Sequence, residues 1–399
     1  MKKTNLRWLT RNLDYLRVPL NAEERANRQG EIPYWGANGI VDQVDEALLD
    51  ERVVLIGEDG APFFESHKDV AFVSEGPIWP NNHIHILKPN PKIIDDRYLC
   101  YFLNQIEYAR YINGSTRDKL TQSQLGSIMI SYPELAEQIS IANFLDQETA
   151  RINQMIVKKR RFLELTANRI DALIDEAISN PTVPQVRFEH AVQRMQRPVV
   201  LSQHDELVRL GLFNRGRGIF KKPAADEEGM GDSNFYFVRE GDLIVSGQFA
   251  WEGAVALATQ NEAGCVVSHR YPIYRGKNGV NTAYLLGLLR SDFGDFILNE
   301  SSRGSAGRNR PLNAWRLGKE KIPIPSIDLQ EAVDHALAFE RTLKKKTARS
   351  INLLTEARAA LINSAVNGQI DVSAWAKQGQ ADRRLDKIEK EMVKSEGRA

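Results

Sequence analysis

The sequence predicts an α+β fold made of two similar mixed α/β domains, each followed by a long helix. Three patterns support this fold class: short stretches that recur in the same order in both halves, short runs typical of strands, and two long segments with apolar residues at heptad spacing. They divide the 399 residues into a first domain at 1–134, a helix at 135–180, a second domain at 181–327, a helix at 328–370 and a charged tail at 371–399.

The internal repeat rests on seven matches that fall in order, spaced by roughly 180 to 194 residues. In the first match, segments 6–8 and 16–19 correspond to 186–188 and 196–199. The other six matches pair 53–57 with 242–247, 82–87 with 268–273, 97–103 with 283–289, 114–115 with 304–305, 128–138 with 322–332, and 173–178 with 361–366. The third match places His83 opposite His269. Each match is short, but their shared order indicates a duplicated domain.

Within the first domain, the runs "RVVLIG", "DVAFVS" and "HIHILK" predict strands, and 96–112 has the spacing of an amphipathic helix. A polar, basic segment, "GSTRDKLTQSQLG", then leads into a short apolar strand that ends at Pro133. The first long helix follows directly. We expect the polar segment to present its side chains to a partner, because the helix behind it fixes its position.

The first long helix has a regular apolar seam over five heptads, and the second helix has a looser one. The predicted seam residues are Leu145, Ile152, Ile156, Leu163, Ile170 and Leu173 in the first helix and Leu337, Ile351, Leu354 and Leu361 in the second. Thr149, Lys159 and Thr166 place polar groups in the first seam, and a shifted register through Phe339 and Leu353 fits the second helix nearly as well. The two helices either pair with each other or pack separately on their own domains.

Composition and charge place the chain among ordinary globular proteins. The net charge is +1, with 42% hydrophobic and 26% charged residues, so the net charge argues neither for nor against a nucleic-acid partner. Cys100 and Cys265 are too few and too far apart for a disulfide framework, and no stretch approaches ~18 apolar residues, so we expect a soluble, cytoplasmic protein. The charge is uneven: 209–222 has five basic residues and no acid, and 303–321 has six against one. The glycines and asparagines of both stretches favour loops.

Catalytic motifs are missing from the sequence. No lysine follows an acidic residue by two positions, as nuclease motifs require, and neither the [DN]PP[YFW] methyltransferase motif nor a phosphate-binding GxxxxGK[ST] loop occurs. His83 and His85 form an H-x-H pair without a third ligand at a suitable spacing, which favours a structural role over metal binding. Glu58 and Asp59, between two glycines, fit a turn better than a carboxylate site.

Several stretches resemble the DNA-specificity subunits of type I restriction-modification systems. They are "IPYWGANGIVDQVDEALLDERVVLIGEDGAPFF", "WPNNHIHILKP", "YINGSTRDKLTQSQLGSIMISYPELAEQISIANFLDQETARI" and "LINSAVNGQIDV". The resemblance covers residues 6 to about 372. It implies two target-recognition domains, each followed by a spacer helix, with the two helices pairing as an antiparallel coiled coil. Each domain would bind one half of a split site in double-stranded DNA.

The resemblance also implies partners. Two adenine-N6 methyltransferase subunits and, in the full complex, two restriction/translocase subunits would bind the chain, which itself would be non-catalytic. S-adenosylmethionine, ATP and Mg are then cofactors of the partners, with none bound by this chain and no membrane involved. The second half departs from the first, because "SGQFAWEGAVA" (246–256) resembles a different class of recognition domain, and the tail after Asp371 lies outside the resemblance.

Candidate DNA contacts are the polar and basic side chains just before each long helix, with a second glycine-rich loop in the second domain. They are Ser115, Thr116, Arg117, Lys119, Thr121, Gln122 and Ser123 in the first domain, and Arg215, Arg217, Arg303, Ser305, Arg308, Asn309 and Arg310 in the second. Arginine and lysine suit guanine or phosphate, and glutamine suits adenine. Alternatively, residues 116–122 hold the loop onto its own domain or onto the methyltransferase. A stand-alone DNA-binding regulator or a non-specific scaffold are the competing functions.

Overall fold

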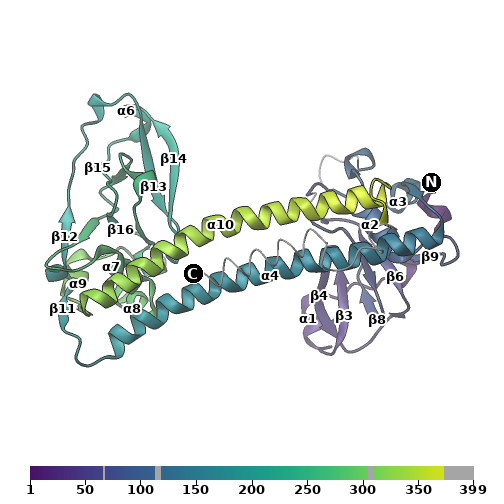
Figure 1. Cartoon of the computed structure of the whole chain (residues 1–399), viewed down its shortest axis with the longest axis horizontal. Helices are drawn as coiled ribbons and strands as arrows, with labels where there is room; N and C mark the ends of the chain where they lie inside the picture. Colours follow the sequence, from purple (N-terminus) through teal and green to yellow (C-terminus); the bar gives the residue numbers. More distant parts are fainter. Residues whose placement is uncertain (66–67, 113–117, 304–309, 373–399) are drawn as a thin grey trace. The chain divides into compact units, whose positions relative to one another are not determined.

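The computed structural model describes residues 1–65, 68–112, 118–303 and 310–372, and the chain divides into two compact units (Figure 1). Unit 1 comprises Met1–Lys158 and Ala348–Ala399, and unit 2 comprises Lys159–Thr347. Most of the predicted charged tail at 371–399 lies outside the described residues. No helix in the described part of the chain combines the length and apolar character needed to cross a bilayer.

The first segment of unit 1 contains all elements from β1 to the start of the first long helix. They are β1 (Lys2–Asn5), η1 (Leu6–Trp8), β2 (Thr10–Asn12), η2 (Asp14–Leu16), α1 (Ala22–Ala26), β3 (Ile32–Gly36), β4 (Gly39–Val44), β5 (Leu49–Asp50), β6 (Val53–Gly57), β7 (Ala71–Ser74), β8 (Pro77–Pro80), β9 (Ile84–Pro89), α2 (Asp96–Leu103), η3 (Tyr108–Arg110), α3 (Gln122–Ser127), β10 (Met129–Tyr132) and α4 (Leu135–Ser179). Helix α4 passes from unit 1 into unit 2 at Lys158.

The elements of unit 2 follow in a similar order. They are β11 (Gln185–Arg187), α5 (Phe188–Ala191), β12 (Val192–Met195), η4 (Leu201–Gln203), β13 (Leu207–Leu212), β14 (Ile219–Ala225), α6 (Glu227–Met230), β15 (Phe235–Phe237), β16 (Leu243–Val245), η5 (Ala250–Glu252), β17 (Val255–Leu257), η6 (Gln260–Glu262), β18 (Val266–Ser268), β19 (Ile273–Gly276), α7 (Thr282–Arg290), α8 (Asp292–Glu300), α9 (Ala314–Lys319), β20 (Lys321–Pro323) and α10 (Ile327–Val366). Helix α10 returns to unit 1 at Ala348.

Two four-stranded sheets face each other in unit 1. The first is antiparallel with strand order β2-β9-β6-β7, and the second has the order β4-β3-β8-β5 with β3 and β8 parallel. Strand β6 explains why "VVLIG" is apolar throughout: Val54 and Ile56 belong to the core on the helix side, whereas Val53 and Leu55 belong to the core between the sheets. Successive side chains of a strand point to opposite faces, so a strand buried on both faces needs apolar residues at every position.

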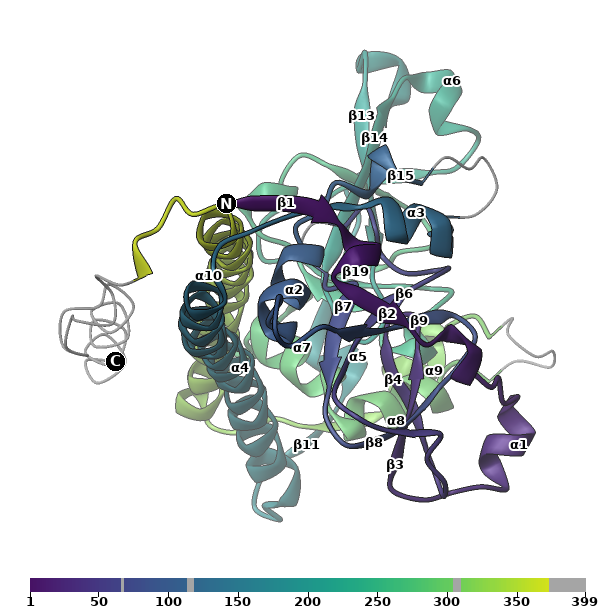
Figure 2. The same cartoon turned by 90° about the vertical axis from the view of Figure 1, so that its right-hand side faces the viewer.

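Helix α2 lies between the first sheet and the long helices of unit 1 (Figure 2). Tyr98 of α2 is fully buried, and its hydroxyl group donates hydrogen bonds to the carbonyl oxygens of Ser131 (2.9 Å) and Val366 (3.2 Å). The core of this unit therefore includes residues from the last described part of the chain, among them Ile362 and Ala365.

The helix predicted at 96–112 is shorter in the structure. Helix α2 ends at Leu103, and only a 3₁₀ turn at Tyr108–Arg110 follows. Asn104 caps the helix and its side-chain oxygen accepts hydrogen bonds from the backbone N–H groups of Val70 (2.8 Å) and Ala71 (2.9 Å). These bonds to β7 turn the chain away from the helical path, which the amphipathic spacing does not reveal.

Unit 2 repeats this topology strand by strand. Its sheets have the orders β12-β19-β16-β17 and β14-β13-β18-β15, with β13 and β18 parallel, and β11 pairs with β20 as β1 pairs with β10. In β16, Leu243 and Val245 face the helices while Ile244 faces the second sheet. Helix α7 of this unit packs against α10, where Arg290 Nη1 donates to Glu340 Oε2 at 3.0 Å. The predicted fold class is confirmed.

The hydrogen-bond registers correct two of the sequence matches. Glu58 N–H donates to His83 O (2.8 Å) where Gly247 N–H donates to Arg270 O (2.6 Å), so His83 corresponds to Arg270 and not to His269. A second correction concerns the edge strands. Thr4 pairs with Ile130 as Val186 pairs with Ile322, so 130, and not 128, corresponds to 322. A shift of two residues leaves each side chain of the strand on the same face of the sheet, so the apolar pattern also matches at the wrong register.

The same registers also move the match between 6–8 and 186–188. Leu6 N–H donates to Ile128 O (2.9 Å) as Phe188 N–H donates to Glu320 O (2.9 Å), so Leu6 corresponds to Phe188. Both side chains are buried in the core of their own unit. Residues of η1 and α5 can therefore be compared position by position.

Helices α4 and α10 pack antiparallel within each unit. In unit 1, Ala142 and Leu145 near the start of α4 share a core with Ile362 near the end of α10. In unit 2, Ile174 near the end of α4 shares a core with Val333 and Leu337 near the start of α10. The two helices of the chain therefore pair with each other.

The predicted seam residues vary in burial along the helices. Leu145, Ile152, Ile170 and Leu337 are buried, and the half-buried ones are Ile156, Leu163, Leu173, Ile351, Leu354 and Leu361. The hydroxyl groups of Thr149 and Thr166 are buried and donate to the carbonyl oxygens of Leu145 (2.7 Å) and Phe162 (3.0 Å) one turn earlier. Their own helix thus satisfies these polar groups in the seam.

Candidate functional site

The polar segment before the first long helix is anchored to the sheet next to it. Of the predicted contacts, Ser115, Thr116 and Arg117 lie outside the described residues, whereas Lys119 and Gln122 are described and exposed. Leu120 N–H donates to the carbonyl oxygen of Glu58 (2.7 Å), and Asp59 and Lys119 form an isolated bridge. The end of β6 thus fixes the backbone that carries Lys119.

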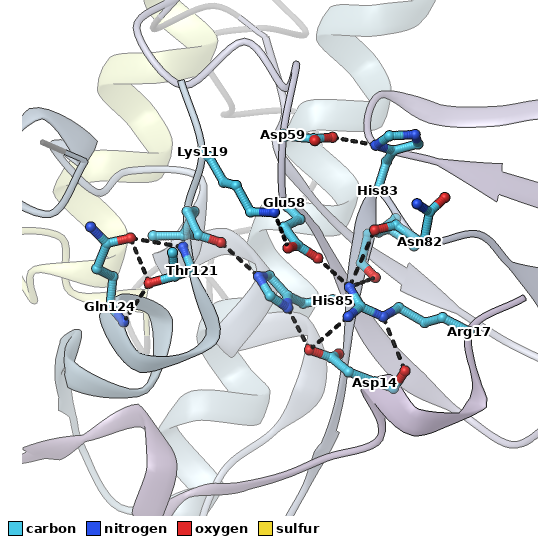
Figure 3. Close-up of polar contacts among 12 residues, drawn as sticks. Asp14, Arg17, Glu58, Asp59, Asn82, His83, His85, Lys119, Thr121 and Gln124 are labelled. Atoms are coloured by element: carbon cyan, nitrogen blue, oxygen red, sulfur yellow. Dashed lines mark hydrogen bonds and ion pairs between the residues drawn. The ribbon is translucent and has the colours of Figure 1, made fainter. Parts of the chain in front are cut away.

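A charge network surrounds this anchor. Figure 3 shows Lys119 and Arg17 converging on the Glu58 carboxylate, at 2.9 Å for Lys119 Nζ and in direct contact for Arg17 Nη1. Burial alone would raise the pKa of the Glu58 carboxyl, but hydrogen bonds and charge from Lys119 and Arg17 outweigh burial and keep that pKa below its usual value. Glu58 is therefore an ionised partner for both cations.

His85 connects the anchor to the rest of unit 1. Its ring is buried; Nδ1 lies 2.6 Å from Asp14 Oδ2 and Nε2 lies 2.7 Å from the carbonyl oxygen of Leu120. Burial opposes ionisation of Asp14, but the hydrogen bond and charge of His85 and a hydrogen bond from Ile86 N–H lower the pKa of the Asp14 carboxyl. Both ring nitrogens of His85 therefore face acceptors, and the ring links Asp14 to the backbone of the anchored segment.

The other features that the sequence singled out in this region have local partners. His83 is half exposed and its Nδ1 contacts Asp59, so His83 and His85 point to different partners. Thr121 caps α3 in a capping box with Gln124, whose side chain accepts from Thr121 N–H (2.8 Å). Among the described residues, no group of three His, Cys, Asp or Glu side chains could hold a metal ion.

A cavity of about 630 Å³ opens beside the anchored segment of unit 1. Its described lining is Asn38, Gly60, Ala61, Pro62, Phe63, Phe64, Glu65, Lys68, Asp69, Phe72 and Asp118. A smaller cavity of about 230 Å³ lies between η1 and α3 and is lined by Arg7, Thr10, Asn12, Gln122 and Ser123 together with apolar residues. The exposed polar side chains of α3 thus share a hollow with Arg7.

Unit 2 anchors its corresponding segment at the same place. Leu312 N–H donates to the carbonyl oxygen of Gly247 (2.8 Å), as Leu120 does to Glu58, and Asn313 caps α9 as Thr121 caps α3. Of the predicted contacts, Ser305, Arg308 and Asn309 lie outside the described residues. Arg303 is exposed and pairs with Glu300. The guanidinium of Arg310 lies 5.1 Å from the ring centroid of Trp251.

The basic stretch at 209–222 is mostly a β-hairpin and not the predicted loop. Strands β13 and β14 account for most of it, and only 213–218 turns between them. Arg215 N–H and Gly216 N–H donate to the carbonyl oxygens of Glu252 (2.8 Å) and Gly253 (2.7 Å). The turn is therefore rigidly held while the side chains of Arg215 and Arg217 are exposed. The second basic stretch likewise contains α9 and β20.

A cavity of about 290 Å³ lies beside this turn in unit 2. Its charged lining residues are Arg217, Glu262, Arg290, Glu340, Arg341 and Lys344. Arg290 and Glu340 form a bidentate pair at 3.0 and 3.1 Å, and Lys344 Nζ lies 2.8 Å from the same carboxylate. The basic side chains outnumber the acids, which suits a polyanion.

Sequence reasoning missed the residues that hold the first candidate segment in place. No sequence pattern pointed to Asp14 or Arg17, and His85 stood out only as the second histidine of the H-x-H pair with His83. The partners Asp14 and His85 are 71 positions apart, so only the fold brings them together. The arrangement offers anchored cations at the ends of two loops per chain and suits the binding of a negatively charged surface.

Comparison with known families identifies part of the chain directly. Residues 18–161 match the family model of the type I restriction modification DNA specificity domain. A Haemophilus influenzae protein named as a type I restriction enzyme specificity subunit is 35% identical over 134 residues, which is 34% of this chain and 34% of that protein. The match thus spans about a third of the length of that relative.

Solved structures share the fold over most of the chain. An S subunit of a type I restriction-modification system from M. genitalium has a TM-score of 0.53 at 13% identity and covers 91% of this chain and 95% of that one. A chain from a structure on assembly and conformational transition of the type I R-M system has a TM-score of 0.55 at 15% identity, covering 92% and 98%. At these identities the likeness establishes the fold of both units and their long helices.

Proposed function

From the match of residues 18–161 to the type I restriction modification DNA specificity domain, we propose that this chain is a specificity subunit: the non-catalytic subunit that recognises a bipartite DNA site, with one half-site bound by each domain. The observation that carries this proposal is the duplicated anchor. Leu120 and Leu312 fix a candidate DNA-binding segment at the same place of the same topology in both units. The two segments differ in sequence, so each domain would read different bases.

The candidate contacts follow from this proposal. Lys119, Gln122, Arg215, Arg217, Arg303 and Arg310 are placed on exposed or half-exposed positions of their units. Basic side chains of this kind neutralise phosphates and reach guanine edges, and glutamine suits adenine. We expect the cytoplasm to be the site of action, because the DNA substrate and the partner subunits meet there.

Partner subunits would supply the chemistry. The long helices carry exposed apolar side chains, among them Val157 and Leu353 in unit 1 and Leu165 in unit 2. Exposed apolar patches on helices are typical of protein interfaces, and they support docking of the methyltransferase subunits and, in a full complex, of restriction/translocase subunits. S-adenosylmethionine, ATP and Mg would bind those partners.

Mapping of N6-methyladenine across the host genome, with and without the gene, tests the proposal. We expect a split sequence motif, two short half-sites with an unspecified gap, whose methylation disappears with the gene. An unchanged methylation map would contradict the proposal and favour a stand-alone DNA-binding regulator. Copurification of the chain with a methyltransferase subunit separates these two functions independently, because only a specificity subunit needs that partner.

A further inference from the structure

Each unit exposes a tryptophan next to its candidate DNA-binding segment. Trp8 in η1 is 71% exposed and Trp315 in α9 is 69% exposed. Tryptophan is on average among the more buried residue types, because its large apolar surface is costly to leave in water. Two such exposures within one chain therefore call for a binding role.

The two tryptophans flank the same junction of the fold. In unit 1, η1 packs on α3 so closely that a Cβ atom at Gly126 would lie 3.5 Å from Arg7 Cβ. In unit 2, α5 packs on α9 in the same way, and a Cβ atom at Gly318 would lie 3.4 Å from Glu189 Cβ. Trp8 follows Arg7 in η1, whereas Trp315 precedes Gly318 in α9. One tryptophan therefore lies on the first helix of its packed pair and the other on the second helix.

Duplication alone does not account for this coincidence. By the hydrogen-bond registers, Trp8 corresponds to His190 and Trp315 corresponds to Ser123. The two domains thus place an exposed indole at one junction from positions that are not equivalent. A shared use of the junction explains this placement, and simple inheritance from one ancestral domain does not.

Basic side chains accompany both tryptophans. Arg7 and Arg11 are exposed and form no ion pair within the described residues. In unit 2, Lys319 Nζ lies 5.7 Å from the ring centroid of Trp315 and pairs with Glu189 at 2.6 Å, whereas Arg316 is exposed without an ion pair in the part of the chain that the structure describes. An exposed aromatic face beside cations suits contact with deoxyribose, accessible base surface and phosphate.

The junction is also continuous with the candidate segments. Helix α3 begins three residues after Lys119, and α9 begins four residues after Arg310. Gln122 and Ser123 of α3 line the same cavity of about 230 Å³ as Arg7. A duplex that touched the segment would therefore lie beside the junction of the same unit.

We propose that Trp8 and Trp315 are aromatic DNA contacts, one for each half-site, that pack an indole face against a base or deoxyribose while the neighbouring basic side chains bind phosphate. The inference rests on the proposed function and names contacts that neither the charge runs nor the sequence motifs indicated. An indole needs no particular base, so these contacts strengthen binding without choosing the sequence.

The test uses the full chain copurified with its methyltransferase and a fluorescent duplex that carries the motif from the methylation map. Trp8→Ala and Trp315→Ala are compared with Trp8→Phe and Trp315→Phe. The controls are Ile40→Ala and Phe296→Ala, which remove apolar side chains exposed by 55% and 61% elsewhere in the two units. Affinity is measured by anisotropy over a series of salt concentrations.

We expect each tryptophan-to-alanine change to weaken binding about tenfold, as is typical of removing one stacked aromatic ring. The salt dependence should stay unchanged, because no charge is lost, whereas Arg7→Gln should reduce its slope by roughly 0.9. The phenylalanine variants should retain most of the affinity, and the controls all of it.

Two results would overturn the inference. Unchanged affinity in both alanine variants would exclude a DNA contact, and loss of copurification with the methyltransferase would assign the junction to that protein instead. A wild-type complex that binds the motif duplex no better than a scrambled duplex would refute the proposed function itself, which keeps the two failures distinct.

Discussion

Arg215 adopts a backbone conformation that favours glycine. Its φ angle is +57°, and among the described residues only Asn278, at +55°, shares a positive φ without being glycine. Such a conformation costs a side-chain-bearing residue roughly 1–2 kcal/mol. The strain persists because hydrogen bonds to Glu252 and Gly253 fix the turn on both sides. A basic side chain kept at a strained, exposed position is a reason to assign it a function.

Arg215→Gly should therefore separate stability from binding. We expect the free energy of unfolding to rise by about 0.5–1 kcal/mol, because relief of strain exceeds the extra entropy of an unfolded glycine. DNA affinity should fall, and the salt slope should decrease by about one phosphate contact. Arg215→Asn, which tolerates the same φ, is the matched control for charge loss. Chemical denaturation and anisotropy measure the two effects, and unaltered DNA affinity in both variants would remove Arg215 from the interface.

The buried pair of Asp14 and His85 determines how the first anchor responds to acid. The pKa of Asp14 is lowered in the folded protein, so its contribution to stability is complete above its unfolded pKa of about 3.9 and is lost as pH falls through the lower folded pKa. Glu58, whose pKa is also lowered, acts in the same direction. The anchor of Lys119 is therefore strongest at neutral pH and weakens below about pH 4.

Asp14→Asn should destabilise the protein by about 3 kcal/mol near pH 6, because it removes the buried carboxylate that the His85 ring and Ile86 N–H contact. The difference from the wild type should shrink as pH falls below about 4, where the carboxylate is protonated first in the unfolded chain and, at still lower pH, in the folded protein. Denaturant unfolding at several pH values measures this difference. A difference that stays constant over that range would show that Asp14 contributes through packing and not through its charge.

At this scale, the sequence indicated charges but not their partners. Lys119 and Arg215 stood out because each lies in a basic, glycine-bearing stretch. Asp14 carries no such signal, since its partner His85 meets it only through the pairing of distant strands. The sequence did not indicate a role for Trp8 either, because the exposure of an aromatic side chain depends on which surfaces the fold leaves uncovered.

At the scale of elements, periodicity identified a few strands of the first domain and both long helices, while ends and registers depended on single contacts. Strands β6, β7 and β9 are confirmed where alternating or apolar runs predicted them. The end of α2 and the correspondence of His83 with Arg270 required hydrogen bonds that no local pattern contains. Register is a property of a pair of strands, so one strand read alone leaves it open.

Two helical glycines should respond in opposite ways to alanine. A Cβ atom at Gly287 of α7 would lie 2.9 Å from Val333 Cγ1 and 3.2 Å from Ile174 Cδ1, so Gly287→Ala should destabilise unit 2 despite its better helix propensity. At Gly126 of α3 the nearest atom is Arg7 Cβ at an ordinary 3.5 Å, so Gly126→Ala should stabilise by up to about 1 kcal/mol. Thermal unfolding of both variants checks the signs, and stabilisation by Gly287→Ala would contradict the close packing of α7.

For the whole molecule, the duplicated plan was the most reliable prediction from sequence. Seven weak matches in order carried more information than any single motif, and both units have the same strand orders. The predicted contacts Ser115, Thr116, Arg117, Ser305, Arg308 and Asn309 stay predictions, since they lie outside the described residues.

Two similar domains with separate cores should exchange as modules. On the proposed function, replacing 181–327 by the matching domain of a type I specificity subunit should change one half-site of the methylated motif and leave the other half-site intact. The reason is that each domain has its own sheets and its own anchored segment. Methylation mapping in cells that express the hybrid measures the outcome. A motif changed in both halves would show that the domains read DNA jointly.

The composition of unit 1 has a consequence for synthesis on the ribosome. Its core takes Ile362, Ala365 and Val366 from α10, and Tyr98 bonds to Val366 O, so the domain translated first lacks part of its interior until α10 emerges. About 190 residues separate Lys158 from Ala348, which corresponds to roughly 10–40 s of translation at typical rates. Unit 2 is contiguous and can finish folding earlier although it is made later. A nascent chain released before α10 would expose the apolar surface of α2, which makes truncated products targets for chaperones and proteases.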